Sequence, residues 1–186
     1  NTPDADIIEM AKVPDILAEL LTGKMDGYYM GTTDNIEKAV DVYMEATDGG
    51  YYFYAMVDGA KKYILPMTGN GLWGGIWGYL ALNDDCNTIY GVYFSHASET
   101  PGLGAEIAGD TFQNRFTKDK DGNAIVKKVY DENGNVALAV EKGKGVAGED
   151  YHIDAVSGAT ITCSGLQVML ETKLAPYYNY LKNQQN

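Results

Sequence analysis

The sequence has few of the residues that build metal sites and disulfide frameworks. Its 186 residues include two cysteines and two histidines. Cys86 and Cys163 lie far apart without CxxC spacing, and neither His96 nor His152 lies close enough in sequence to form a ligand cluster with them. This pattern predicts no metal site. Two cysteines allow one disulfide, so cysteine usage does not fix the redox compartment.

Positive charge is also scarce. Fourteen Lys and Arg residues stand against 26 Asp and Glu residues, which gives a net charge of -12. Such a surface repels a polyanion, so we expect no nucleic-acid partner. An anionic ligand would have to be held by local features of the fold.

Long apolar runs are missing as well. No stretch approaches the roughly 18 uninterrupted apolar residues that span a bilayer. The first residues, NTPDADIIEM, have the pattern of neither a signal peptide nor an anchor. The sequence begins at Asn1 without a starting Met, so membrane attachment through a preceding segment stays open. With 45% apolar residues, the chain can bury the core of one domain.

Two helices are predicted in the N-terminal part. Apolar residues with helical spacing run through residues 4–21, where Pro14 is expected to break or kink the helix. A second helix is predicted over residues 35–46, because Asp34 and Glu37 have the spacing of a capping box. We expect an N-terminal helical segment over residues 1–50 that packs on a domain over 51–186, so that the two form one compact unit.

From Tyr51 onward the apolar residues alternate with a period of two, which is typical of strands. The segments YYFYAMVDG and KKYILPM predict a hairpin about Asp58 and Gly59. GIWGYLAL and TIYGVYFSH predict two further strands joined by the turn NDDCN. NAIVKKVY and NVALAVEK are expected to pair about Asn133 and Gly134. The middle of the chain is therefore predicted to be antiparallel sheet.

A last helix is predicted to begin at Ser164, with Gln167 as its capping partner and a possible kink at Pro176. Its apolar stripe consists of Leu166, Met169, Leu170, Leu174, Tyr177, Tyr178 and Leu181. The order of elements predicts an α+β fold, in which N-terminal and C-terminal helices flank an antiparallel β-sheet core.

The segment GNGLWG, residues 69–74, matches the GxGxxG pattern of a dinucleotide-binding turn, but its context contradicts that function. Such a turn needs a helix after it and an acidic residue about 20 positions later. Here a predicted strand follows, and Asp84 and Asp85 come too early. We interpret the segment as a glycine-rich bend where another backbone or a flat ligand comes close.

The segment ETPGLG begins at Glu99 and predicts a type II turn from its Pro-Gly pair. An ordinary turn explains these residues on their own. The alternative is a ligand site, in which the backbone amides of Gly102 and Gly104 face a bound molecule. Leu103 would then cover an apolar ring, and Glu99 or Thr100 would provide a polar contact.

The segment DAVSGAT runs from Asp154 to Thr160, just before the last predicted helix. Its hydroxyl residues suit the cap of that helix. They also suit an anion site, because a helix start offers unpaired amides and the positive end of its dipole to a phosphate. Gly158 and Ala159 leave room for such a group.

In this order along the chain, GNGLW, ETPGLGAE and DAVSGAT resemble the FMN-binding domain of the NqrC family, a component of the sodium-translocating NADH:quinone reductase. The resemblance covers about residues 68–181. The same domain type occurs in the RnfG component of the Rnf electron-transport complex. No single motif would be sufficient, whereas the ordered set is specific.

The resemblance implies a signal read by a flavin transferase, which uses FAD and Mg²⁺ to join FMN through its phosphate to the last threonine of the signal. The matching residues are Asp154, Ala155, Val156, Ser157, Gly158, Ala159 and Thr160. Thr160 is thus the expected attachment point, and Thr162, outside the signal, is the competing hydroxyl. A threonine without a base is a weak nucleophile, so we expect no catalytic residue here and a base supplied by the transferase.

By the same resemblance, further flavin contacts would be Leu72, Trp73, Glu99, Thr100, Leu103 and Gly104. The implied function is electron transport in a reductase that passes electrons from NADH to ubiquinone and exports sodium. The implied partners are the other subunits, and the implied location is the periplasmic side of the inner membrane, held by one N-terminal span absent from this sequence. Two alternatives stay open: an RnfG-like protein, and an extracytoplasmic ligand-binding module without flavin.

Overall fold

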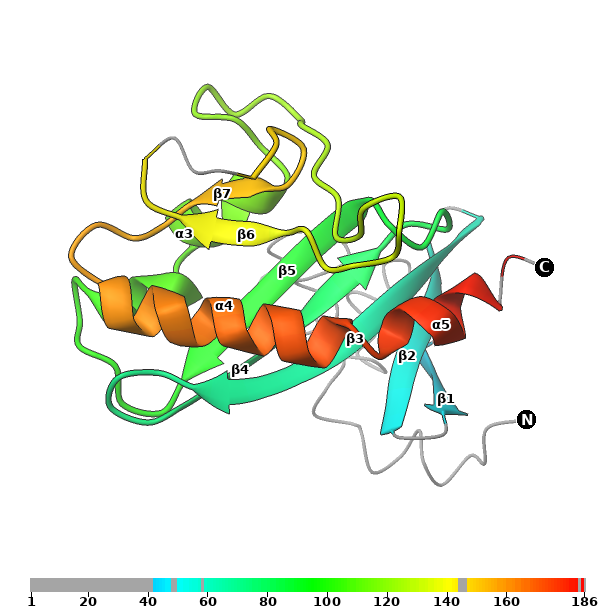
Figure 1. The fold of residues 1–186 in the computed structure, drawn as a ribbon, viewed down its shortest axis with the longest axis horizontal. Coiled ribbons are helices and arrows are strands. Elements are labelled where there is room, and N and C mark those ends of the chain that lie inside the picture. Colours follow the sequence, from blue (N-terminus) through cyan, green and yellow to red (C-terminus); the bar gives the residue numbers. More distant parts are fainter. Residues whose placement is uncertain (1–41, 48–49, 58, 144–146, 184, 186) are drawn as a thin grey trace, which may run out of the picture.

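A computed structural model describes residues 42–47, 50–57, 59–143, 147–183 and 185, and its main feature is a five-stranded antiparallel sheet (Figure 1). The strands follow one another in sequence order: β1 (Val42–Thr47), β2 (Gly50–Val57), β3 (Ala60–Asn70), β4 (Gly75–Leu82) and β5 (Ile89–His96). This simple order arises because each strand is joined to the next by a short turn. The strands predicted from the period-two pattern of residues 51–96 are thus confirmed.

The turns of the sheet are built by local hydrogen bonds. Val57 pairs with Ala60 across the predicted turn at residues 58–59. Between β4 and β5, the Asp85 carboxylate accepts hydrogen bonds from the amides of Asn87 and Thr88, at 2.9 and 2.8 Å. An Asp side chain that binds amides a few residues later is a common way to stabilise a turn.

Both faces of the sheet carry buried apolar residues. Leu65 and Leu80 belong to the larger core cluster, whereas their neighbours Ile64 and Ala81 belong to a second cluster. Successive residues of a strand point to opposite faces, so these two clusters lie on opposite sides of the sheet.

Two helices cover the face of the sheet that carries the larger cluster. In Figure 1, α4 (Thr160–Leu174) lies across the strands and α5 (Tyr177–Lys182) continues beyond it. Pro176 is the N-cap residue of α5, at the predicted kink. The predicted stripe is buried at Leu166, Met169, Leu170, Leu174 and Leu181, each at most 1% exposed.

A cluster of aromatic rings fixes the segment that follows β5. This segment contains two 3₁₀ helices, η2 (Gly104–Ala108) and η3 (Asn114–Phe116), and the short helix α3 (Asp110–Gln113). The rings of Phe94, Phe112 and Phe116 lie with centroids 5.6 to 6.3 Å apart, and all three are buried. The loop after β5 is therefore held against the sheet by packing.

The predicted hairpin of NAIVKKVY and NVALAVEK is wrong except for its turn. Gly134 has the positive φ of 82° that such a turn requires, but only one isolated bridge, Tyr130 to Val136, joins the two segments. The amides of Val129 and Tyr130 donate to the side chain of Asn87. Because that side chain occupies them, they are not available for a strand ladder.

The second of those segments pairs elsewhere. β6 (Ala139–Glu141) pairs in parallel with β7 (His152–Asp154), which leads directly into DAVSGAT. A parallel pair joins segments far apart in sequence, so no local turn signal predicts it.

The helix predicted over residues 35–46 is also wrong in its C-terminal half. Residues Val42–Thr47 form β1, whose register with β2 pairs Val42 with Ala55. Pairing with a neighbouring strand prevails here over the helical pattern. The rest of that prediction, and the helix predicted over residues 4–21, lie outside the described residues.

The predicted α+β class is confirmed, with an antiparallel sheet as its core and C-terminal helices on one face. Cys86 and Cys163 are both buried and free, so no disulfide joins them. In the described part of the chain, no helix is both long enough and apolar enough to cross a membrane.

Candidate functional site

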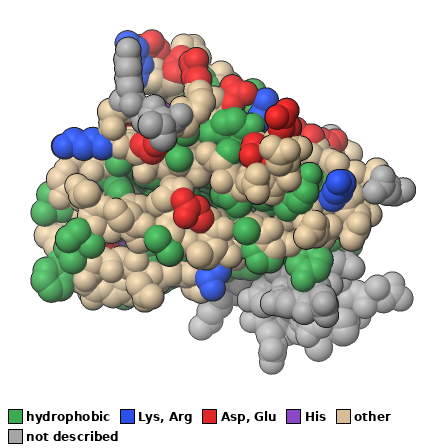
Figure 2. All heavy atoms as spheres, in the orientation of Figure 1, with side chains coloured by type: hydrophobic (Ala, Val, Ile, Leu, Met, Phe, Trp, Pro, Cys, Tyr) green, Lys and Arg blue, Asp and Glu red, His purple; other side chains and the backbone are tan. Residues whose placement is uncertain are grey.

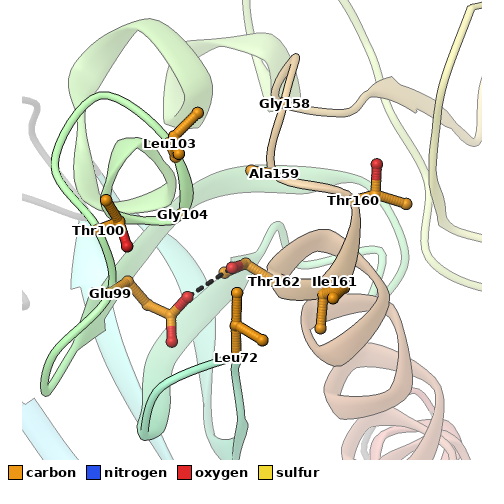
Figure 3. A pocket seen from close by; sticks show the side chains of 10 residues that line it. All are labelled: Leu72, Glu99, Thr100, Leu103, Gly104, Gly158, Ala159, Thr160, Ile161 and Thr162. Carbon is orange, nitrogen blue, oxygen red and sulfur yellow. Dashed lines mark hydrogen bonds between the residues drawn. The ribbon is translucent and has the colours of Figure 1, made fainter.

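The three sequence motifs meet around one cavity of about 220 Å³ (Figure 3). Its walls come from the β3–β4 turn, the loop after β5 and the start of α4. The lining residues are Leu72, Glu99, Thr100, Leu103, Gly104, Gly158, Ala159, Thr160, Ile161 and Thr162. Of the predicted contacts, Trp73, Asp154 and Ser157 lie outside the lining. Ile161 was not predicted, because it carries no motif signal, and Thr162 was expected only as a competing hydroxyl.

Two tight turns form facing walls of this cavity. In the first, the amide of Leu103 donates to the Thr100 carbonyl at 3.1 Å and Gly102 has a φ of 74°, as the predicted type II turn requires. In the second, the amide of Ala159 donates to the Val156 carbonyl at 3.2 Å. Its third residue, Gly158, has a φ of 78°, which residues with a side chain rarely adopt.

The start of α4 carries no side-chain cap. The helix begins at Thr160, and its N-cap residue Ala159 makes no side-chain capping bond. The predicted start at Ser164 is wrong: Ser164 lies inside the helix, where its hydroxyl donates to the Thr160 carbonyl at 2.9 Å. Its expected capping partner, Gln167, instead accepts a hydrogen bond from the amide of Val140 at 2.7 Å.

The capping function suggested for the hydroxyls of DAVSGAT is therefore also wrong. A 15-residue helix without a cap leaves the amides of its first turn available to another acceptor. Together with the positive end of the helix dipole, these amides favour an anion at Thr160.

Glu99 connects GNGLWG and ETPGLG with the first turn of α4, which follows DAVSGAT. Its side chain is only 4% exposed, and both carboxylate oxygens are hydrogen-bonded. Oε1 accepts from the Trp73 amide at 2.8 Å, and Oε2 accepts from the Thr162 hydroxyl at 2.5 Å. The β3–β4 turn and the start of α4 are thus both bound to the first residue of ETPGLG.

The charge state of Glu99 follows from these contacts. Burial, the largest single influence, raises the pKa of its carboxyl, because it penalises the charged form. Hydrogen bonds from Thr162 and from the amides of Trp73 and Leu72 act in the opposite direction, and His96 adds a smaller effect of the same sign. Their combined effect is larger, so the pKa of Glu99 lies below its usual value.

Gly104 is confined by the same network. A Cβ at this position would lie 2.4 Å from the Thr162 hydroxyl oxygen and 2.5 Å from Glu99 Oε2. Only glycine allows the backbone to pass this close to the hydrogen-bonded pair.

The two threonines at the start of α4 are in different environments. Thr160 is exposed, whereas Thr162 is 2% exposed. In Figure 3, the Thr162 hydroxyl points toward Glu99 and the Thr160 side chain points away from it. Of the two hydroxyls, that of Thr160 is accessible to another protein.

A polar cluster holds the strand that leads into DAVSGAT. His152 lies between two carboxylates, with Nδ1 3.1 Å from Glu141 Oε2 and Nε2 3.0 Å from Asp154 Oδ1. Arg115, the one arginine of the chain, donates from Nη1 to the carbonyls of Asp154 and Ala155 at 2.6 and 3.0 Å. Arg115 was not predicted, because it lies 39 residues from Asp154 and belongs to no motif.

The rim of the cavity is apolar and open. Leu72 and Leu103 are each 43% exposed and Ile161 is 59% exposed. Figure 2 shows apolar side chains at the surface over this end of the molecule. The cavity is smaller than the roughly 300–1,000 Å³ of pockets that enclose a drug-sized ligand. A flat ring seated here would be partly buried against apolar side chains and partly exposed.

These features define a class of domain: an α+β unit in which an uncapped helix start with an accessible hydroxyl adjoins an apolar cavity. Comparison with known families makes the assignment specific. The FMN-binding domain family matches residues 71–175, so the chain belongs to this family.

The resemblance to NqrC is confirmed by individual relatives. The NqrC component of the Na(+)-translocating NADH-quinone reductase of Neisseria meningitidis (strain Z2491) is 40% identical over 125 residues, which are 64% of this chain. Its counterpart in Vibrio vulnificus (strain YJ016) is 36% identical over 122 residues, or 66% of this chain. The matched part spans less than half of each of these relatives, 45% of their length.

Comparison with solved structures supports the same resemblance. The crystal structure of the corresponding Na(+)-translocating NADH-quinone reductase component from Parabacteroides distasonis superposes with a TM-score of 0.70 at 32% identity. The alignment covers 97% of this chain and 98% of that one. The Shewanella oneidensis NqrC structure, with a TM-score of 0.67 and 22% identity over 97% of this chain and 99% of that one, shares the fold.

Proposed function

We propose that this chain is an electron-carrier domain that holds FMN covalently, through a phosphoester to the hydroxyl of Thr160. The observation that carries the proposal is the position of Thr160. It is an exposed threonine at the uncapped start of α4, on the edge of the cavity that the three motifs form. FMN supplies the electron chemistry when bound, whereas the protein binds it, orients it and adjusts its potential.

The residues around Thr160 suit the two halves of FMN. The amides of the first helical turn are suited to the phosphodiester charge that remains after attachment. Leu72, Leu103 and Ile161 offer apolar surface to the ring system. Asp154 and Ser157, outside the lining, are proposed to be read by the transferase.

The attachment reaction itself belongs to the flavin transferase. Glu99 is the one ionisable side chain in the lining of the cavity, and both of its oxygens already accept hydrogen bonds. The Thr160 side chain points away from Glu99 (Figure 3), so Glu99 is not placed to act as the base that a threonine nucleophile needs. The transferase supplies this base in our proposal.

For the whole protein, we propose the NqrC component of a sodium-translocating NADH:quinone reductase that reduces ubiquinone. Its partners would be the other subunits of that complex. An N-terminal span would anchor it in the inner membrane with this domain on the periplasmic side. The names and identities of the relatives favour this assignment over the RnfG component of the Rnf complex. Within this chain, the expected boundary at residue 50 cuts through the β1–β2 pair, so we propose an FMN-binding domain that includes β1 as well as residues 51–186.

Covalent attachment can be tested by producing the chain together with a flavin transferase. After denaturation, we expect flavin fluorescence that stays with the protein and a mass increase of one FMN less one water. Thr160→Ala should lose both signals. Ser164→Ala is the matched control, because it removes another exposed hydroxyl of the same helix outside the cavity lining, and it should keep both.

Peptide mapping of the loaded chain then identifies the modified residue. Flavin on Ser157 or Thr162 would move the attachment site. A wild-type chain that stays unmodified beside an active transferase would contradict the proposed function, and would favour a ligand-binding module without flavin.

A further inference from the structure

Glu99 places a negative charge in the wall of the cavity. It is the one ionisable residue of the lining, and it is 4% exposed. Its hydrogen-bond donors, the Thr162 hydroxyl and the amides of Trp73 and Leu72, are uncharged. His96 adds a smaller electrostatic effect, and its Nδ1 accepts a hydrogen bond from the Glu99 backbone amide at 3.1 Å. Among the described residues, no lysine or arginine forms an ion pair with it.

Neutral donors stabilise a carboxylate without cancelling its charge. The pKa of Glu99 lies below its usual value, because these hydrogen bonds outweigh the effect of burial, so the side chain is ionised at neutral pH. A buried charge is screened less by water and salt than one at the surface. Glu99 therefore acts on the contents of the cavity as a fixed negative charge.

We propose that Glu99 lowers the reduction potential of FMN in this cavity, because its carboxylate opposes the negative charge that electrons bring to the ring. This inference rests on the proposed function. Reduction of a flavin takes up two electrons from the reductant and one or two protons from solvent, and no bond to the protein forms or breaks. Glu99 exchanges neither electrons nor protons in this step and acts only through its charge.

Glu99→Gln is the appropriate variant, since Gln has nearly the same shape and removes the charge. Its amide oxygen can still accept from the Trp73 amide, and its NH₂ group can donate to the Thr162 hydroxyl oxygen. The matched control is Glu106→Gln, which removes the same charge from an exposed residue of η2 outside the lining. Solvent screens that charge, so its removal should have little effect. Glu106 Oε1 accepts a hydrogen bond from the Gly102 amide at 3.1 Å, and the amide oxygen of Gln can accept the same bond.

The experiment uses the full chain loaded with FMN by the transferase, with loading checked by mass before each measurement. The midpoint potential is measured by equilibrium titration against a reference dye. For Glu99→Gln we expect a higher potential than for wild type, by about tenfold in the equilibrium constant, which is about 30 mV for a two-electron couple. Glu106→Gln should stay close to wild type.

A second measurement on the unloaded wild-type chain needs no variant. The carboxyl ¹³C shift of Glu99, assigned by NMR, reports whether the group is ionised at pH 7. An ionised carboxyl is expected, and a neutral one overturns the proposal. If Glu99→Gln takes up no flavin while wild type does, a neutral carboxyl in this measurement still overturns the proposal.

The remaining outcomes are distinct. A loaded Glu99→Gln chain with an unchanged or lower potential overturns the role of Glu99 and leaves the proposed function intact. An equal rise of the midpoint potential in Glu106→Gln also overturns the role of Glu99 and leaves the proposed function intact. The effect would then come from the net charge of the chain and not from the charge in the cavity wall. A wild-type chain that takes no FMN overturns the proposed function, and this inference with it.

Discussion

At the scale of single residues, His152 joins β6 to β7, the strand that runs into DAVSGAT. It contacts Glu141 on β6 and Asp154 on β7, while Arg115 binds the Asp154 carbonyl from η3. The hydrogen bond to Asp154 is the main cause that raises the pKa of His152, burial acts against it, and Glu141 adds to the rise. The charged imidazole is therefore favoured in the folded state.

The sign of the resulting pH dependence follows from this shift. A histidine whose pKa is higher in the folded than in the unfolded state stabilises the fold below its unfolded pKa of about 6.5. That stabilisation is lost as the pH rises through the folded pKa. The variant His152→Gln tests this effect. The difference in free energy of unfolding between wild type and the variant should be larger at pH 6 than at pH 9, by about 1 kcal/mol.

Urea unfolding of the unloaded chains at several pH values measures this difference. Asp154→Asn removes one of the two carboxylates and should reduce the pH dependence without abolishing it, because Glu141 remains. A difference between wild type and His152→Gln that is equal at pH 6 and pH 9 would show that the imidazole contributes only by packing.

At the scale of elements, the position of α4 depends on its close approach to the β3–β4 hairpin. Gly165 on the helix faces the carbonyl of Asn70 at the end of β3, and a Cβ there would lie 2.1 Å from that oxygen. Gly69 similarly leaves room for Met169, because a Cβ added at Gly69 would lie 2.8 Å from the Cβ of Met169. The cavity lies at this end of the hairpin, so the same contact sets the distance between its walls.

Gly165→Ala should destabilise the protein although alanine favours helix. Helix propensity alone would stabilise the variant by about 1 kcal/mol. The clash is with backbone, which cannot turn aside, and overpacking of this kind costs about 1–3 kcal/mol or more. The difference is an expected net loss of up to about 2 kcal/mol or more in the free energy of unfolding by urea.

Ser164→Ala is the control for that experiment, because its side chain is exposed in the same helical turn. It should be neutral or stabilise by up to about 0.5 kcal/mol. If Gly165→Ala gained stability like the control, the helix and the hairpin would lie farther apart than in this structure.

Elements were predictable where their partners are local. The strands β2 to β5 follow from alternation and short turns, because each pairs with its neighbour in sequence. The start of α4 was missed because Ser164 and Gln167 have the spacing of a capping box, while the turn at Gly158 begins the helix four residues earlier. The parallel pair of β6 and β7 has no turn signal at all.

The site was predictable in parts and not as an assembly. GNGLWG could be identified as a bend, ETPGLG as a turn and DAVSGAT as the approach to a helix, and their ordered combination indicated the family. Glu99 binds Trp73 in GNGLWG and Thr162 in the helix that follows DAVSGAT, and these partners lie 26 and 63 residues away. Contacts at such separations depend on the fold and leave no periodic pattern in the sequence.

At the scale of the whole molecule, the net charge of -12 and the uncapped start of α4 have opposite effects on the binding of an anion. The uncapped start of α4 favours a bound phosphate by a free energy of about 0.3–1 kcal/mol, and this effect is confined to the first turn of the helix. The acidic surface repels the same phosphate over longer distances at low salt. A covalent bond to Thr160 would keep FMN in place whichever effect is larger, because a tether raises its effective concentration.

The balance can be measured on Thr160→Ala, which cannot form the bond, by fluorescence titration with riboflavin and with free FMN. The two ligands share the ring and differ in the phosphate, so the ratio of their affinities isolates its contribution. If net charge dominates, raising the ionic strength from about 0.01 to 0.15 M should strengthen FMN binding about tenfold and leave riboflavin unchanged. FMN that binds more tightly than riboflavin at low salt, and weakens as salt is added, would show that the helix start outweighs the acidic surface.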